Sequence, residues 1–543
     1  MAMPFLLRVS PIAAAVAMAL SGGAGAATIP VNGTSCTLAN AIRAANTDRA
    51  VRGCAAGRGA DVLRLNARTH TLTAVDSDLS HGANGLPLVT SVITINGDPR
   101  GTGRGAVIQR STATDTPDFR LLAVVRGDLT LSSVTLRNGL AKKEWEYYRY
   151  FHRENGGGIA VFGGQLTLDH STVTRNHAGD GGGIFADTAE GPVMVTLRDS
   201  TVVSNSAGGD EGVPRSDGGS GGGILGPVIM TRSVVSKNYG GGIQGDATLL
   251  DSIVRDNRGT GIIADSVNLL RSTVSDNVSK YSVGGVKSGR FLIEDSTISG
   301  NVSTYAVSAG DVEGSGKIIH STISGITRLP FATSDQVGLV ALGEVELTNT
   351  IISNHSPDCE GAPILVGTNL IADGTCGGSA GDPRLGPLLN NGGLVQTHAL
   401  LPGSKAINTA VGAACSAHDQ RGARRPQGAR CDIGAFERIT RVDGAVRPIV
   451  TFFDGALANG TLSGSGPVEE QPFRAQAIRH SILLAGEFNR AGSKLQTCDQ
   501  LKRTLDRIDK DGATPGGSDY VTGSAAPELV ANIESVTTQL DCD

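Results

Sequence analysis

The chain has 543 residues, of which 39% are apolar and only 4% aromatic, and it contains 75 glycines. This composition is typical of many short strands and tight turns built from small and β-branched residues, and it excludes a helical globule. The formal net charge is −5 and lysine and arginine form no long run, so nucleic acid is not an expected partner.

Residues 1–26 have the pattern of a cleaved secretory signal. Arg8 precedes an apolar, alanine-rich run that ends at Leu20, and a small-residue cleavage site follows at residues 24–26. A retained membrane anchor is the alternative, but Pro11 interrupts the run and the run is short for a span. We therefore expect an exported protein without a transmembrane segment in its mature part. Its location would be extracellular or at the cell surface, with the periplasm as the other option.

Residues 27–60 are predicted to form an N-terminal helical cap. In the stretch SCTLANAIRAANTDRAVRGC, Thr34 or Ser35 can cap a short helix, and Leu38 and Ile42 share one face of it. A polar-faced helix of this kind is what covers the open end of a stacked β structure, where strand edges lack partners.

The same region carries a family resemblance. CTLANAIRAAN, followed by GCAAGRGADVLRL and THTLT, resembles the N-terminal CSLREA segment of secreted bacterial β-helix proteins. This copy departs from the family's sequence at Thr37, Ala39 and Asn40. The resemblance implies export and a β-helix fold, and it extends through the strand-like stretch NGLPLVTSVITING.

Residues 61–438 consist of short alternating strands separated by Gly, Asp and Asn turns. One phrase recurs there: an apolar strand, a small polar pair, a second short strand and then Asn, with later copies roughly 20 residues apart. We predict an all-β fold, a right-handed, single-stranded parallel β-helix in which each copy is one coil. The copies end at Asn138, Asn176, Asn205, Asn238, Asn257, Asn277, Asn301 and Asn354.

The repeated Asn and the GGGI phrases between the copies have a structural explanation. Parallel strands stack about 4.8 Å apart, so equivalent side chains of successive coils align. Asn tolerates the left-handed backbone of a sharp corner and can hydrogen-bond to the next Asn along the axis. Glycine suits positive φ angles and crowded backbone. We therefore expect a structural ladder here and no phosphate site.

Two insertions interrupt the period at the same corner, at residues 141–155 and 207–220, and Asp180 lies between them. Exposed aromatic rings beside basic residues can stack on sugars and pair with uronate or sulfate groups. The alternative is that the first insertion folds down as a lid and its rings are local core. The candidate ligand-binding residues are Trp145, Tyr147, Tyr148, Arg149, Tyr150, Arg153, Asp180, Asp210, Glu211 and Asp217.

Eight cysteines fall in four local couples. An even count in an exported protein favours disulfides over metal ligands, and no couple has the CxxC spacing of a zinc site. We predict at least three bridges and no metal site. The couples are Cys36 with Cys54, Cys359 with Cys376, Cys415 with Cys431, and Cys498 with Cys542.

The stretch DQRGARRPQGARCDIGAFE at residues 419–437 resembles the C-terminal end of choice-of-anchor β-helix proteins. We expect its charged residues to form a bidentate arginine–carboxylate network that closes the last coil, and the alternative is an ionic ligand site. These residues are Arg421, Arg424, Arg425, Asp432 and Glu437.

The last part of the chain changes character. Residues 439–470 are predicted to be a linker or a short β element, and residues 471–543 a small antiparallel helical appendage. Carboxylates at residues 506–511 have the spacing of a calcium loop, but the glutamate that such a loop needs further on is missing. We expect no cofactor, with calcium at this loop as the alternative.

The two resemblances imply an adhesin-like role, since the families include surface proteins and polymorphic outer-membrane passengers. We expect a monomeric surface or extracellular binding or scaffold protein that recognises polysaccharide or a cell-envelope component, and the sequence identifies no catalytic residue. The alternative is a polysaccharide lyase, hydrolase or uronan epimerase acting on an acidic glycan. That chemistry needs a base beside a cation, or paired carboxylates, which the charged residues of the two insertions could supply.

Overall fold

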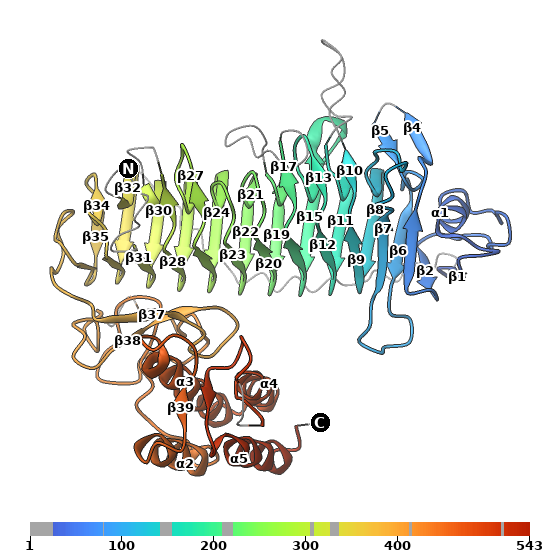
Figure 1. Ribbon diagram of the computed structural model, residues 1–543. Coiled ribbons are helices and arrows are strands. Elements are labelled where there is room, and N and C mark those ends of the chain that lie inside the picture. The colour runs from blue at the N-terminus through green and yellow to red at the C-terminus, as the bar shows by residue number, and fades with distance from the viewer. Residues whose placement is uncertain are drawn as a thin grey trace.

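The computed structural model describes residues 25–79, 81–141, 155–208, 221–304, 309–325, 336–411, 415–511 and 515–542. These residues form a long stack of parallel strands, with a smaller helical part beside the C-terminal half of the stack (Figure 1). No helix in the described ranges is long and apolar enough to cross a membrane. Of the predicted signal, residues 1–24 lie outside the described ranges.

Two large parallel sheets build the stack. The first, which we call the bent sheet, has 17 described strands. The first coils contribute one short strand each, and the coils from β8 onward contribute either one long strand or two short ones. Its strands are β1 (Thr28–Val31), β2 (Asp61–Leu65), β6 (Val92–Asn96), β8 (Leu122–Ser132), β11 (Ile159–Asp169), β14 (Ile184–Asp187), β15 (Val193–Arg198), β18 (Ile224–Leu225), β19 (Val228–Thr231), β21 (Ile243–Gln244), β22 (Ala247–Leu250), β24 (Ile262–Leu270), β27 (Val286–Glu294), β30 (Ala309–Ile319), β32 (Val337–Thr348), β34 (Cys359–Glu360) and β35 (Ile364–Val366).

The second, the straight sheet, has 12 described strands, one from each coil. They are β3 (Thr69–Leu72), β7 (Ala106–Arg110), β9 (Val134–Arg137), β12 (Thr172–Thr174), β16 (Thr201–Val203), β20 (Val234–Ser236), β23 (Ile253–Arg255), β25 (Thr273–Ser275), β28 (Thr297–Ser299), β31 (Thr322–Ser324), β33 (Ile351–Ser353) and β36 (Leu370–Ile371).

Smaller pairings complete the β structure. On the third side of the coils, a three-stranded parallel sheet consists of β10 (Leu140–Ala141), β13 (His177–Ala178) and β17 (Ser206–Ala207). A parallel pair there consists of β26 (Val278–Ser279) and β29 (Val302–Ser303). Antiparallel pairs are β4 (Ser77–Leu79) with β5 (Gly82–Asn84), β37 (Leu385–Leu389) with β38 (Thr397–Leu400), and β39 (Ser463–Gly464) with β40 (Val521–Thr522).

The core lies inside the coils, where alternate residues of every strand point inward. In the bent sheet Ile184, Ile224, Ile243 and Ile262 stack in register, and all four are buried. Every pairing within the two large sheets is parallel, and connections between parallel strands are right-handed in nearly all proteins. The predicted fold class, a right-handed parallel β-helix, is confirmed.

The Asn ladder is confirmed, with one correction to its geometry. Asn205 Nδ2 donates to Asn238 Oδ1 at 3.1 Å, and Asn238 Nδ2 to Asn257 Oδ1 at 3.0 Å. From Asn176 to Asn301, however, the left-handed residue is the one before the Asn, such as Lys237 with φ 55°. The buried Asn keeps an ordinary φ because its side chain must point into the coil to reach its neighbour, so the preceding residue makes the turn.

A second ladder runs along the serines of the small polar pair. The backbone N–H of each serine donates to the hydroxyl of the serine in the next coil, as from Ser233 to Ser252 at 3.1 Å. The hydroxyl in turn donates to a backbone carbonyl two residues back, from Ser252 to Leu250 at 2.8 Å. Both ladders satisfy buried polar groups at corners where strand pairing stops.

The N-terminal helix α1 (Leu38–Thr47) covers the first coil, but its cap is Thr37 and neither Thr34 nor Ser35. The backbone around Thr34 is instead held by Asn32, whose Oδ1 accepts from Thr34 N at 3.0 Å. All four predicted cysteine couples are disulfides in the structure.

Beyond the last coil the chain turns back and lies along the outer face of the straight sheet. Thr273 Oγ1 donates to Gln396 O at 2.8 Å and Thr297 Oγ1 to Gln420 Oε1 at 2.5 Å. We call residues 385–437 the closing segment. It runs beside the solenoid and does not cap its end, so the prediction that it closes the last coil is wrong. The aligned outward threonines of successive coils offer a regular row of hydroxyls on which this polar segment docks.

The predicted arginine–carboxylate network is present within the closing segment in part. Arg421 Nη2 lies 2.7 Å from Asp419 Oδ2, and Arg425 Nη1 lies 3.2 Å from Glu437 Oε2, all buried. Arg421 donates both Nε and Nη2 to the same carboxylate oxygen, so the pair is not bidentate. Arg424 is exposed and forms no ion pair with another described residue.

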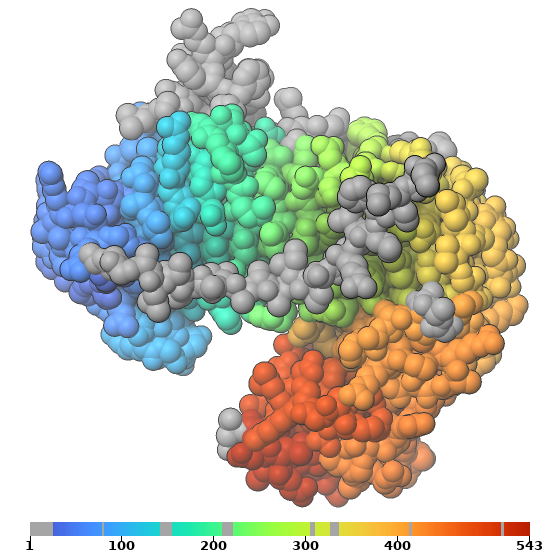
Figure 2. Space-filling model, turned by 180° about the vertical axis from the view of Figure 1, so that it is seen from behind, coloured from blue at the N-terminus to red at the C-terminus, as the bar shows by residue number. Residues whose placement is uncertain are grey.

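The helical part comprises α2 (Arg447–Ala458), α3 (Gln471–Arg490), α4 (Lys494–Leu505) and α5 (Ala526–Gln539). The predicted linker at residues 439–470 thus contains a helix, because Ile449, Val450 and Phe453 form a buried stripe that the glycine-rich end of this stretch obscured. The part docks on the closing segment, where Gly393 N donates to Gln500 Oε1 at 2.9 Å. Figure 2 shows it in orange and red beside the C-terminal coils, with the N-terminal coils extending past it.

Candidate ligand-binding groove

In the middle coils the bent sheet is interrupted between two short strands, as between β21 and β22, and a groove lies on the outer side of this bend. Gly245 separates β21 from β22 and has φ 138°, and it stacks on Gly226 of the preceding coil with φ 131°. A Cβ atom on Gly245 would lie 2.5 Å from Gly226 O. Side chains are therefore excluded at Gly226 and Gly245, which leaves open space on the outer side of the bend in these two coils.

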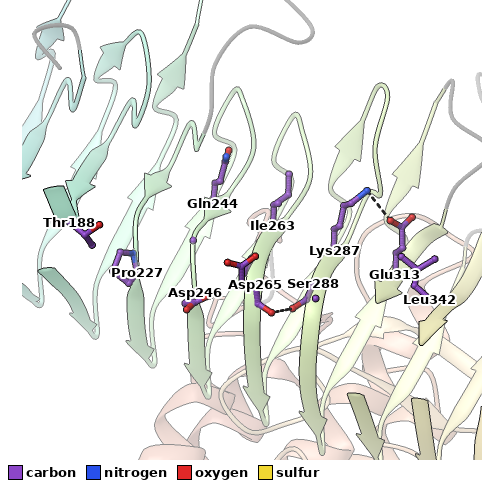
Figure 3. A pocket seen from close by; sticks show the side chains of 13 residues that line it. Thr188, Pro227, Gln244, Asp246, Ile263, Asp265, Lys287, Ser288, Glu313 and Leu342 are labelled. Carbon is purple, nitrogen blue, oxygen red and sulfur yellow. Dashed lines mark hydrogen bonds and ion pairs between the residues drawn. The ribbon is translucent and has the colours of Figure 1, made fainter. Parts of the chain in front are cut away.

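This space is a groove of about 650 Å³ that crosses successive coils. Figure 3 shows its labelled side chains spread over consecutive strands, with Lys287 pointing toward Glu313. Its lining residues are Thr188, Pro227, Gln244, Gly245, Asp246, Ile263, Ala264, Asp265, Lys287, Ser288, Gly289, Glu313 and Leu342.

One wall of the groove is a row of register partners. Gln244 pairs with Ile263, Ile263 with Lys287, and Lys287 with Glu313. Each is one coil further along, about 4.8 Å from the last, so the wall repeats along the axis. Lys287 Nζ lies 2.8 Å from Glu313 Oε1, and their side chains are 46% and 11% exposed.

Two further carboxylates line the bend, and both are exposed. Asp246 Oδ1 accepts a hydrogen bond from Ser266 N at 2.9 Å. Between the register pairs Gln244–Ile263 and Ala247–Val267, the strand β24 has one residue more than the preceding coil. Asp265 lies in this longer stretch and is exposed beside the groove.

The remaining lining is apolar. Pro227, Ile263 and Ala264 line the groove without charge, and Leu342 is 67% exposed at the C-terminal end. A few placed polar groups on an apolar surface are typical of sites for small molecules and chain-like ligands. Sugar rings match such a surface because they present an apolar face and a hydroxyl edge.

The sequence-predicted site residues are not the residues of this groove. Asp180 is half-buried at the corner beside β13, where its carbonyl oxygen accepts from Gly156 N at 3.0 Å, and it does not line the groove. The other nine candidates lie outside the described residues: Trp145, Tyr147, Tyr148, Arg149, Tyr150, Arg153, Asp210, Glu211 and Asp217.

The groove residues lie outside the repeated Asn and Gly phrases, which are the strongest periodic signals of the sequence. A signal was available: aligning the coils on their Asn places IQGDATLL, IIADSVNLL and VKSGRFLIE together. Each has a polar or glycine break between two apolar runs at the same register. Polar or glycine residues that interrupt the apolar pattern at the same position of successive coils indicate a bend in the sheet with a polar outer side.

A buried ionic cluster near the end of the stack is structural. His355 Nε2 lies 2.8 Å from Asp311 Oδ2, and His355 Nδ1 lies 3.5 Å from Asp358 Oδ1. The two carboxylates raise the pKa of His355 to about 9 against the opposing effect of its burial. Asp311 also accepts from Asn301 Nδ2 at 2.7 Å, so the cluster is the terminus of the Asn ladder.

Among the residues that the structure describes, no group of three or more His, Cys, Asp or Glu side chains is arranged to hold a metal ion. Within the predicted calcium loop, Asp509 is buried and accepts from Thr522 Oγ1 at 2.6 Å. Calcium binding there stays untested, since residues 512–514 lie outside the described ranges.

Neither a family model nor a curated protein matches the sequence. Among solved structures, the chain is similar to the crystal structure of the pectate lyase Pel9A, with 13% sequence identity and a TM-score of 0.41. The similarity covers 77% of this chain and 98% of that one. The fold assignment rests on the parallel pairings described above.

Proposed function

We propose that the protein is an exported β-helix binding or scaffold protein that holds a polysaccharide chain along the groove of the bent sheet. The observation that carries this proposal is the wall of register partners from Gln244 to Glu313, which presents one side chain per coil beside an open groove. A ligand that repeats along its own length can contact such a wall several times.

The side chains that line the groove indicate a ligand with both apolar and polar faces. Apolar surface at the exposed Leu342 and the half-buried Ile263 suits the faces of sugar rings, and Gln244 and the carboxylates suit their hydroxyl groups. The four disulfides support an oxidising compartment, as expected for an extracellular or surface protein.

The test is a binding assay against neutral, acidic and amino-sugar oligosaccharides with a matched pair of variants. Leu342→Ala removes an apolar contact in the groove, and Leu495→Ala removes a leucine that is 82% exposed on α4. We expect Leu342→Ala to weaken binding about fivefold, since roughly 1 kcal/mol of apolar contact is lost. Leu495→Ala should bind like the unchanged protein. Equal affinities for all three proteins would overturn the proposal.

The alternative is a lyase, hydrolase or epimerase. It is favoured by one observation, namely that the carboxylate of Asp265 and the ammonium of Lys287 line the same groove from neighbouring coils. A base beside a cation can abstract a proton next to a carboxylate group. Turnover of a uronan, followed by ultraviolet absorbance and reducing ends and lost in Asp265→Asn, would replace the binding proposal with this one.

A further inference from the structure

The charges of the groove select among polysaccharides, and this inference rests on the function proposed above. The lining carries the carboxylates Asp246, Asp265 and Glu313 but only one ammonium, that of Lys287. Just beyond the lining, the exposed Arg290 and Glu344 offset each other. The groove therefore has a negative excess that the ion pair between Lys287 and Glu313 does not remove.

We propose that the groove binds a polysaccharide of amino sugars with free, protonated amino groups, and that it rejects polyuronates. A uronate carboxylate would meet Asp246 and Asp265 as like charges, which disfavours binding. An ammonium group on a sugar meets the same two carboxylates as opposite charges.

The molecule itself contains the contact that such a ligand would make. Lys287 Nζ donates to Glu313 Oε1 at 2.8 Å across adjacent coils of the groove wall. Asp246 and Asp265 lie on the two preceding coils, exposed, and each can accept a hydrogen bond from a ligand ammonium. Because one coil repeats about every 4.8 Å, ammonium groups on successive sugars can reach carboxylates on successive coils.

The apolar part of the lining adds a second kind of contact to the ionic one. Pro227, Ile263 and Ala264 contribute no charge and lie beside the carboxylates. A flat sugar ring can cover more of this surface than the narrow methylene chain of a small polyamine. We therefore expect amino-sugar oligomers to bind more tightly than linear polyamines of equal charge.

The experiment compares four probes with the full-length protein: a glucosamine oligomer below the pKa of its amino groups, the same oligomer N-acetylated, spermine, and oligogalacturonate with and without Ca²⁺. The glucosamine oligomer should bind best, and its affinity should fall with salt because exposed charge pairs are screened. The double variant Asp246→Asn/Asp265→Asn should weaken it about tenfold, the sum of two exposed ion pairs.

A matched control separates the groove from the negative charge of the whole protein. Asp48→Asn/Asp115→Asn removes two exposed carboxylates outside the groove lining, and it should leave the affinity within about twofold. An equal loss in both double variants would overturn the inference, and so would spermine binding as tightly as the oligomer.

The remaining outcomes distinguish this inference from the proposed function. Tighter binding of the N-acetylated oligomer, or of oligogalacturonate with Ca²⁺ and reversed by a chelator, would overturn the amino-sugar class while leaving a glycan-binding groove in place. Binding of no probe by the unchanged protein would overturn both.

Discussion

The outer faces of the straight and bent sheets both arise from coils stacked in register, but one face is covered and the other lines an open groove. Both present rows of side chains aligned coil by coil. The row of the straight sheet at Thr273, Thr297 and Thr322 is covered, because the closing segment bonds to all three threonines. The row of the bent sheet from Gln244 to Glu313 lines an open groove. Both faces thus offer aligned rows of side chains, and among the described residues the closing segment covers the row of the straight sheet.

The largest expected difference in stability is between an ion pair of the covered face and the ion pair of the groove. Arg425 has a fully buried side chain, pairs with Glu437, and donates to Gly434 O at 2.6 Å. Arg425→Ala should lower the free energy of unfolding by about 3–5 kcal/mol, because it leaves a buried carboxylate without its partner. Lys287→Ala removes the partly solvated pair of the groove and should cost about 1 kcal/mol or less. Urea unfolding of both variants measures the two losses of stability. Similar losses would contradict the expected difference between the buried and the solvated ion pair.

A pair of glutamines gives the next largest contrast. Gln420 is buried under the closing segment and bonds to Ser272 O, Thr273 Oγ1 and Thr297 Oγ1. Gln420→Ala should lower the free energy of unfolding by about 2–3 kcal/mol, through unsatisfied polar groups and a cavity. Gln244→Ala, in the open groove, should change it by less than about 0.5 kcal/mol. Thermal unfolding decides between this result and a Gln244 that is equally important for stability.

Part of the pH dependence of the free energy of unfolding should come from Asp295, which lies under the closing segment. Burial raises the pKa of Asp295 to about 7, although Arg425 and a hydrogen bond from Ser416 oppose the shift. A raised carboxyl pKa gives stability that is complete below the unfolded pKa of about 4 and lost as the pH rises through the folded value. His355 acts in the same direction at higher pH, since its stabilisation is complete below its unfolded pKa of about 6.5 and is lost as the pH rises through about 9.

We therefore expect the free energy of unfolding to fall by about 2–3 kcal/mol between pH 5 and pH 8 through Asp295. Asp295→Asn should flatten this fall, and hydrogen exchange should place the faster opening in the closing segment. A curve of unchanged slope in Asp295→Asn would assign the pH dependence to other groups.

The repeat made most of the fold predictable, because a periodic sequence implies periodic contacts. The Asn ladder, the disulfides and the helical cap follow from local spacing alone. The path of the closing segment did not follow, since docking on the side of the solenoid depends on Thr273 and Gln420, which are 147 positions apart. The helix α2 was missed because its glycines and asparagine lie next to the buried stripe around Phe453.

The candidate site was harder to predict than the fold for a physical reason. Asp246, Asp265 and Lys287 are unremarkable in sequence and become neighbours only when the coils stack in register. The rare aromatic residues around Trp145 drew attention instead, and they lie outside the described residues.

Binding of an oligosaccharide to the paired leucine variants tests the central claim most directly. With titration calorimetry on the glycan class that the unchanged protein prefers, Leu342→Ala should bind about fivefold more weakly, while Leu495→Ala should match the unchanged protein. Unchanged affinity in Leu342→Ala, or an equal loss in Leu495→Ala, would contradict the assignment of the groove as the binding site.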